Sequence, residues 1–402
     1  MTTVLDGLRQ LVTPLPDGDL RVLEPGWLAI QDGRVVETGT GRAPAADGRL
    51  DGAGLVGLPG FVDSHTHAVF GRTRVEEFER RLAGASYAEI AAAGGGILAS
   101  VADLRARSEE ALVRLALPRL AAMLGSGTTT AEVKSGYGLT TADEVKTLRA
   151  VRRLRDLAGL ELVPTFLGAH AVPPEFAGDR AAYVRLLIEE GLPAVAGEGL
   201  AEFCDVFCDA GAFTVDEARA VLTAARRLGL GLKVHSDEFR SLGATEMAVE
   251  LGAASADHLL RVTDAGVAAL ASGRTVATLL PGTALFLGLP YAPARRLLEA
   301  GVTLALATDF NPGSSPCTSM ARVWTLACCG MRLTPAEALR ALTHGGALAL
   351  GRGDDLGCLA PGFRADVGLF DVEDWREVPY FFGENRCARV VRAGTAVELR
   401  EG

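Results

Sequence analysis

The sequence has few basic residues for its acidic ones, no CxxC pair and no long apolar run, and each shortage excludes a class of protein. The formal net charge of the 402 residues is −10, and the basic residues are nearly all arginine, with lysine only at Lys134, Lys146 and Lys233. Proteins that bind nucleic acid or an anionic membrane surface normally carry a basic patch. We therefore expect no nucleic acid and no membrane as a partner.

The cysteines and the apolar runs point to a cytoplasmic protein. The 7 cysteines contain no CxxC pair, and the pair Cys204 and Cys208 is not followed by a second pair at zinc-finger spacing. Buried, reduced thiols account best for this odd number. The longest uncharged run, residues 275–294, is broken by prolines and glycines, so we expect no membrane helix there. Residues 1–7 lack a basic start and an apolar core, so we also expect no signal peptide.

The chain is long enough for one large domain and one smaller domain, because single cores stop growing near about 250–300 residues. Both ends read as short strands separated by turns, whereas the middle alternates apolar β-branched runs with helical patterns. Eight runs are strand candidates: residues 60–67, 128–134, 161–170, 203–209, 232–238, 255–259, 275–281 and 303–309. Helices are expected between them, for example over residues 141–158, 214–228 and 241–251.

Strands that alternate with helices form right-handed βαβ units and a parallel sheet. Eight such units predict an α/β fold with a (β/α)8 TIM-type barrel, which we assign to residues 58–351. Chain termini often lie close together. We therefore expect residues 1–57 and 352–402 to form one small composite β-sandwich domain outside the barrel.

Five of the six histidines fall at the carboxyl ends of the predicted strands, where such barrels hold their chemistry. His65 and His67 are two residues apart, so an extended strand directs both to one face. Together they favour a metal site over the alternative of two surface histidines in a loop. His235 is the third expected ligand and Asp309 the fourth, although Asp309 could instead cap the turn before Asn311. The end of the fourth strand carries no lysine that could bridge two ions, so we expect one metal ion and a hydrolytic reaction.

Three further polar residues are candidates for proton transfer or substrate contact. Glu238 follows His235 by three residues and could act as general acid or base, with Asp237 as a rival position and a solvated loop carboxylate as the alternative. His258 could orient the water, or it could be a packed histidine with a satisfied hydrogen bond. His170 is expected to contact substrate, and His344 to be structural.

The loops after the first two strands contain groups that suit a substrate carboxylate. Arg74 offers a guanidinium fork, and Tyr87 and Tyr137 offer phenols nearby. No GxxxxGK[ST] motif occurs, so the glycine-rich stretches are not a phosphate loop.

Several of these segments resemble a known family. Residues 58–67 (LPGFVDSHTH) resemble the first-strand motif of the amidohydrolase superfamily. Within that superfamily the chain is similar to the imidazolonepropionase family over nearly its whole length. The segments that carry this likeness are residues 67–71 (HAVFG) with Arg74 and residues 77–78, then 84–87 (GASY), 93–97 (AGGGI), 132–139 (EVKSGYGL), 235–238 (HSDE) and 309–314 (DFNPGS).

The resemblance implies a metal-dependent hydrolase of cyclic amides in histidine metabolism. It implies ring opening of 4-imidazolone-5-propanoate to N-formimidoyl-L-glutamate. The positions that match the family's metal ligands are His65, His67, His235 and Asp309, for one divalent or trivalent ion per subunit, with zinc as first choice and iron as alternative. The positions that match substrate contacts are Arg74, Tyr87, Tyr137, His170, Glu238, Asn311, Gly313 and Ser314. Glu238, His258 and Asp309 match the residues that move protons or lie beside the attacking water.

Two other readings remain open. A different cyclic amidohydrolase or a deaminase could use the same metal site, but a deaminase of a neutral base has less need of Arg74 as a carboxylate clamp. An inactive barrel that serves as a binding protein should have lost some ligand residues, and all are present here. A homodimer is expected because twofold pairs are the commonest assembly.

Overall fold

The computed structural model describes residues 1–85, 89 and 94–397, and its central feature is a parallel eight-stranded sheet curled into a nearly closed barrel. Its strands are β8 (Phe61–Asp63), β9 (Thr128–Lys134), β10 (Glu161–Ala169), β11 (Phe203–Cys208), β12 (Gly231–Ser236), β13 (Ser255–His258), β14 (Val276–Leu279) and β15 (Leu304–Leu306). Each pairs in parallel with the next strand along the chain. The expected (β/α)8 barrel is confirmed.

The first and last strands close the barrel through only a few contacts. Thr66 forms a parallel bridge with Phe310, and the amide of Asp309 donates to the His65 carbonyl at 3.0 Å. The Asp63 carboxylate takes the place of further ladder bonds, because it accepts from both the amide and the hydroxyl of Thr308.

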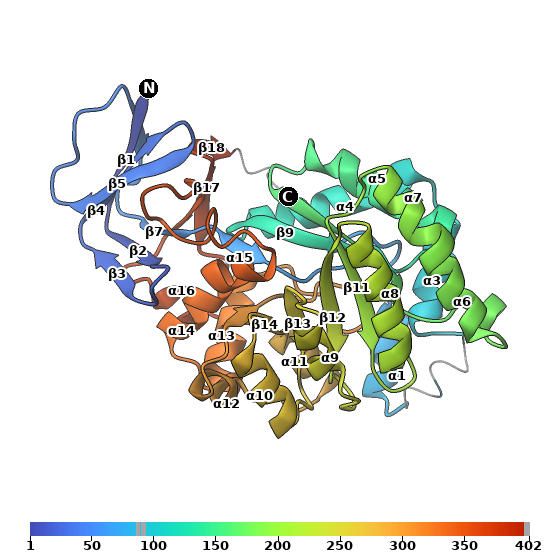
Figure 1. Ribbon diagram of the computed structural model, residues 1–402. Helices are drawn as coiled ribbons and strands as arrows, with labels where there is room; N and C mark the ends of the chain where they lie inside the picture. The colour runs from blue at the N-terminus through green and yellow to red at the C-terminus, as the bar shows by residue number, and fades with distance from the viewer. Residues whose placement is uncertain (86–88, 90–93, 398–402) are drawn as a thin grey trace.

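Helices cover the outside of the barrel, as Figure 1 shows for α5, α7 and α8. The helices before β15 are α1 (Val75–Leu82), α3 (Ile97–Arg105), α4 (Glu109–Leu124), α5 (Thr141–Arg155), α6 (Arg180–Leu186), α7 (Leu192–Gly197), α8 (Val215–Arg227), α9 (Ala244–Glu250), α10 (Asp264–Ser272), α11 (Pro281–Leu287) and α12 (Ala294–Glu299). After β15 follow α13 (Met320–Met331), α14 (Pro335–Arg340), α15 (Gly346–Ala349) and α16 (Glu377–Tyr380), and three further helical turns are η1 (Pro174–Phe176), η2 (Leu187–Gly191) and η3 (Ala341–Gly345). A capping box at Thr214 and Glu217 begins α8. In the described part of the chain, no helix has the length and apolar character needed to span a bilayer.

Strands from both ends of the chain form two further sheets at one end of the molecule (Figure 1). The first, in the order β5-β4-β1-β6, contains β1 (Thr2–Leu8), β4 (Gly26–Gln31), β5 (Arg34–Thr40) and β6 (Gly48–Asp51). The second, in the order β18-β17-β16-β7-β2-β3, contains β2 (Gln10–Pro14), β3 (Leu20–Leu23), β7 (Val56–Pro59), β16 (Val367–Phe370), β17 (Cys387–Arg392) and β18 (Thr395–Val397).

The two terminal sheets share an apolar core and also pack on the barrel. Leu5 and Leu28 of the first sheet are buried in one cluster with Leu11 and Val367 of the second, which makes the pair a sandwich. At the junction, the ring of Phe370 in β16 lies 5.6 Å from that of Phe61 in β8. β7 of the terminal sheet ends at Pro59, and β8 of the barrel begins at Phe61.

Candidate metal and substrate site

The predicted metal ligands come from three parts of the barrel that are far apart in the chain. His235 lies on β12, whereas His65 and His67 follow β8 and Asp309 follows β15. The first strand is shorter than expected: it ends at Asp63 rather than at residue 67. Its backbone bonds nevertheless continue, because the amide of Lys134 donates to Thr66 on one side and Asp309 donates to His65 on the other. These bonds keep residues 65–67 extended, so His65 and His67 both face the centre of the site.

The four side chains converge at the mouth of the barrel. The Nε2 atoms of His65 and His67 each lie 3.5 Å from Oδ1 of Asp309. The ring centres of His65 and His235 are 4.4 Å apart, and those of His67 and His235 are 5.5 Å apart. Two overlapping triplets have donor atoms within 4.8 Å of one another, namely His65 with His67 and Asp309, and His65 with His235 and His258.

The unpaired ring nitrogens test whether these residues suit a metal ion. Nε2 of His65 and Nε2 of His235 are buried and have no hydrogen-bond partner among the described residues. Buried polar atoms normally have a partner. Burial also lowers the pKa of His65 well below its usual value, so its imidazole is neutral and can donate an electron pair. The imidazoles and the Asp309 carboxylate therefore fit a divalent metal ion.

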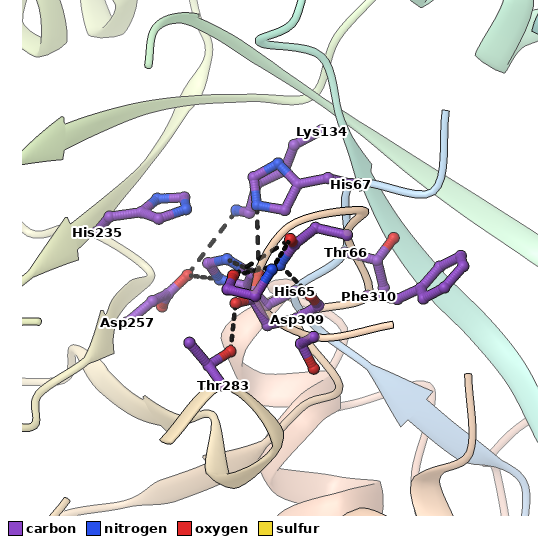
Figure 2. Close-up of polar contacts among 12 residues, drawn as sticks. His65, Thr66, His67, Lys134, His235, Asp257, Thr283, Asp309 and Phe310 are labelled. Carbon is purple, nitrogen blue, oxygen red and sulfur yellow. Dashed lines mark hydrogen bonds and ion pairs between the residues drawn. The ribbon is translucent and has the colours of Figure 1, made fainter. Parts of the chain in front are cut away.

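Two buried carboxylates orient the histidine rings from behind. Oδ2 of Asp257 on β13 lies 2.6 Å from Nδ1 of His65 (Figure 2), and Oδ2 of Asp205 on β11 lies 2.9 Å from Nδ1 of His235. A carboxylate on the second ring nitrogen fixes the tautomer and orientation of a metal-binding histidine. The sequence interpretation missed both residues. The signal for Asp205 was an acidic residue inside the otherwise apolar strand β11.

Asp309 is held ionised at its position. Thr283 on α11 donates a short hydrogen bond to Oδ2 (Figure 2), a contact that the sequence did not indicate. Burial opposes the negative charge, but His67, His258 and Thr283 outweigh it and lower the pKa of Asp309 to about 2. Its φ of 51° lies in the left-handed region, which non-glycine residues seldom adopt outside functional sites. The alternative of a turn cap does not apply, because Asn311 supplies the turn by accepting from the amides of Gly313 and Ser314.

Glu238 and His258 face one another beside the ligands. Oε2 of Glu238 lies 3.8 Å from Nε2 of His258. Burial raises the pKa of Glu238 well above its usual value, and the charges of Asp309 and Asp209 add to this. Burial lowers the pKa of His258 to about 3, so this ring is neutral. Within the described residues neither of its nitrogens has a hydrogen-bond partner, and the packed-histidine alternative therefore loses its support. The rival Asp237 is bound instead by the Thr245 hydroxyl at 2.7 Å.

One pocket brings together three of the four proposed ligands and most of the predicted substrate contacts. Its lining includes His67, Arg74, Ile97, Tyr137, His170, Phe207, His235, Glu238, His258, Asp309, Asn311 and Ser314. Of these, Ile97 and Phe207 were not predicted, because an apolar side chain near a strand end has no chemical signature. Tyr87 lies outside the described residues. His344 lies in η3 and contacts the Gly353 carbonyl at 3.1 Å.

Arg74 lines the pocket, and its guanidinium lies against Gly313. Its guanidinium is held by both oxygens of Glu77, at 3.0 and 2.6 Å. A Cβ at Gly313 would overlap Nη1 of Arg74, so a larger residue there would displace the guanidinium from its present position. His170 stacks on His67 with ring centres 5.3 Å apart and contacts the Gly136 carbonyl at 2.9 Å, which places it closer to the ligands than its strand suggested.

Comparisons with known proteins agree with this arrangement. Residues 56–397 match the amidohydrolase family. The chain is 48% identical to an imidazolonepropionase of Symbiobacterium thermophilum, covering 94% of this chain and 91% of the relative, and 51% identical to one of Myxococcus xanthus, covering 91% and 89%. Among solved structures, a triazine hydrolase variant superimposes with a TM-score of 0.77 at 20% identity, covering 98% of this chain and 94% of that one. An adenosine deaminase from Xanthomonas campestris with bound zinc gives 0.72 at 19% identity, covering 98% and 92%. The chain therefore belongs to the amidohydrolase family and, within it, to the imidazolonepropionase family.

Proposed function

We propose that this chain hydrolyses the ring carbon–nitrogen bond of 4-imidazolone-5-propanoate and so forms N-formimidoyl-L-glutamate in histidine degradation. The named relatives at 48% and 51% identity support this assignment. The observation that carries it is that one pocket joins the His/Asp cluster to Arg74 and Tyr137. The cluster suits hydrolysis, and the guanidinium suits the propanoate of the substrate.

His65, His67, His235 and Asp309 are proposed to hold one divalent metal ion, with zinc as first choice. Three imidazoles and one carboxylate are donors that zinc accepts, and they also suit iron, which is the alternative. When bound, such an ion lowers the pKa of water and polarises a carbonyl oxygen.

The substrate is proposed to lie with its propanoate on Arg74 and its ring towards Glu238. A carboxylate on Arg74 would compete with Glu77, which now occupies the guanidinium fork. Tyr137 and His170 line the wall next to His67, and Asn311, Gly313 and Ser314 form the loop on the other side. Tyr87 is proposed as a further contact from the family likeness alone.

Two residues are proposed to move the protons, and a third is proposed to orient the water. Hydrolysis adds a hydroxyl to the ring carbon and a proton to the departing nitrogen. Asp309 is ionised and can accept a proton from the attacking water. Glu238 holds its proton because of its raised pKa and can donate it to the ring nitrogen. The neutral His258 lies beside Glu238 and can accept a hydrogen bond from the water.

An absorbance assay of 4-imidazolone-5-propanoate loss, with and without chelator, tests the proposal when combined with elemental analysis of the same sample. We expect chelator-sensitive turnover with about one metal ion per chain, as a site of three or four protein ligands implies. Bound metal without turnover would move the search to other cyclic amides or to deamination. A sample that neither binds metal nor turns over after reloading would favour the binding-protein alternative.

We also propose that the enzyme works in the cytoplasm as a homodimer. All 7 cysteines are free, which suits a reducing compartment. Sedimentation of the purified chain measures the assembly.

A further inference from the structure

A network of buried charges lies beneath the proposed metal site. Its five side chains are all fully buried: Glu132, Lys134, Asp205, Lys233 and Asp257. They come from the barrel strands β9, β11, β12 and β13. Charged side chains are almost never buried in this way unless they are paired. Five of them inside one barrel cost desolvation free energy that a merely structural core would avoid.

Lys134 is the centre of this network. Its Nζ lies 2.7 Å from Oδ2 of Asp205, 2.9 Å from Oε1 of Glu132 and 3.8 Å from Oδ2 of Asp257. The two aspartate oxygens are the same atoms that contact the histidine rings, at 2.9 Å for His235 and 2.6 Å for His65. Each therefore lies between the ammonium group and one imidazole, as Figure 2 shows for Asp257.

Lys233 supports the network from the other side. Its Nζ lies 2.9 Å from Oε2 of Glu132 and donates to the Ser64 carbonyl at 2.7 Å. Glu132 therefore joins the two lysines. Because Ser64 precedes His65 in the chain, Lys233 also fixes the backbone that carries a proposed ligand.

The charges of this network match a divalent ion. Three carboxylates and two ammonium groups leave one negative charge, and Asp309 at the site adds a second. A divalent cation held by Asp309 and the histidines would make the whole group neutral.

We propose that Lys134 is a positioning residue for the metal site: it holds Asp205 and Asp257 in place, and through them the ring orientations of His235 and His65. This inference rests on the proposed function, whose metal site it deepens. Loss of such an outer partner typically weakens metal affinity by about 10–100-fold.

Cobalt(II) binding to the full chain tests this role without any measurement of turnover. The variant is Lys134→Met, and the matched control is Lys146→Met, which removes a lysine paired with Asp143 on helix α5. The dissociation constant is measured by competition with a chromophoric chelator, and the visible spectrum reports the ligand geometry. We expect the Lys134 variant to bind cobalt(II) about 10–100-fold more weakly with an altered spectrum, and the Lys146 variant to match the wild type.

An unchanged affinity and spectrum in Lys134→Met would overturn the proposal. A lower melting temperature with an unchanged spectrum would overturn it as well, because Lys134 would then serve stability alone. If Lys134→Met does not fold, Lys134→Gln, which keeps a donor but no charge, is judged by the same two measurements. A wild-type chain that binds no cobalt(II) would instead contradict the proposed metal site itself.

Discussion

At the residue scale, His65 and His235 are each fixed by a carboxylate on one nitrogen and left free on the other. Replacing either with alanine removes a ligand and leaves an aspartate buried without its partner. We expect His65→Ala and His235→Ala to lose bound metal and turnover together, as seen by elemental analysis and the absorbance assay. His344→Ala is the control and should keep its metal, because His344 contacts Gly353 rather than the cluster. Full metal content and activity in either ligand variant would refute the assignment.

Arg74 governs recognition of the acid group in the proposed complex. A hydrogen bond between charged groups contributes about 1.5–3 kcal/mol, so Arg74→Ala should raise KM by about 10–100-fold. Steady-state kinetics on 4-imidazolone-5-propanoate measures this change. Arg72→Ala removes an exposed arginine two residues away and should leave KM unaltered. An unchanged KM in Arg74→Ala would remove this residue from the substrate site.

Glu238 should give activity an upper pH limit. Burial raises its pKa, so the group keeps its proton to a higher pH than an exposed glutamate does and loses it as the pH rises through that raised value. A proton donor is inactive once ionised, and kcat/KM should therefore fall on the alkaline side. Glu238→Gln should abolish this alkaline decrease of kcat/KM and lower kcat by about 10²–10⁴-fold. Asp237→Asn is the comparison, and loss of the decrease in that variant instead would identify Asp237 as the donor.

The sequence predicted the site residues that lie near one another at a strand end. It did not predict those that come together only when distant strands pack in the fold. His65 and His67 are neighbours in the chain, so their spacing already indicated a common face. Asp257 on β13 contacts His65 beyond β8, and Asp205 on β11 contacts His235 on β12. No local sequence pattern encodes these contacts between strands.

At the element scale, the sequence predicted all eight barrel strands, but several predicted strand ends differ from those in the structure. The strand over residues 128–134 matches β9 in full, whereas the expected strand 303–309 is reduced to Leu304–Leu306. The difference has a physical cause. Beyond residue 306 the backbone turns into the site, and Thr308 bonds to the Asp63 side chain instead of a ladder partner.

The loop after β12 depends on one carboxylate at the end of β11. Asp209 accepts from the amides of Glu238, Phe239 and Arg240, at 2.8, 2.8 and 2.9 Å. We expect Asp209→Ala to lower the free energy of unfolding by about 2–3 kcal/mol and to lower kcat, because Glu238 loses its anchor. Denaturant unfolding and kinetics measure the two effects.

Helix α8 offers the control for that loop variant. Thr214→Ala removes a helix cap and should cost about 1 kcal/mol while leaving kcat unchanged. Equal losses of kcat in the two variants would mean that stability alone explains the effect at Asp209.

At the scale of the whole molecule, both chain ends join one structure that packs on the barrel. The sequence indicated that the two chain ends could form one domain, but it did not predict which strands pair. In the structure, β7 pairs with β2 on one side and with β16 on the other. One buried cluster contains Val12 and Phe370 of the terminal sheet together with Phe61 and Trp324 of the barrel region. The two parts therefore share apolar contacts that neither keeps alone.

This shared core predicts how the molecule responds to loss of metal. An ion that binds only the native state at 100 times its dissociation constant adds about 2.7 kcal/mol to stability. Because the sandwich and the barrel share a core, removal of the metal should lower the stability of both parts. We expect far-UV circular dichroism and tryptophan fluorescence to report one coincident melting transition, shifted to lower temperature by chelator and restored by added zinc. Two transitions, of which only one responds to chelator, would mean that the terminal sandwich unfolds on its own and that the contacts between Phe370 and Phe61 do not couple the two parts.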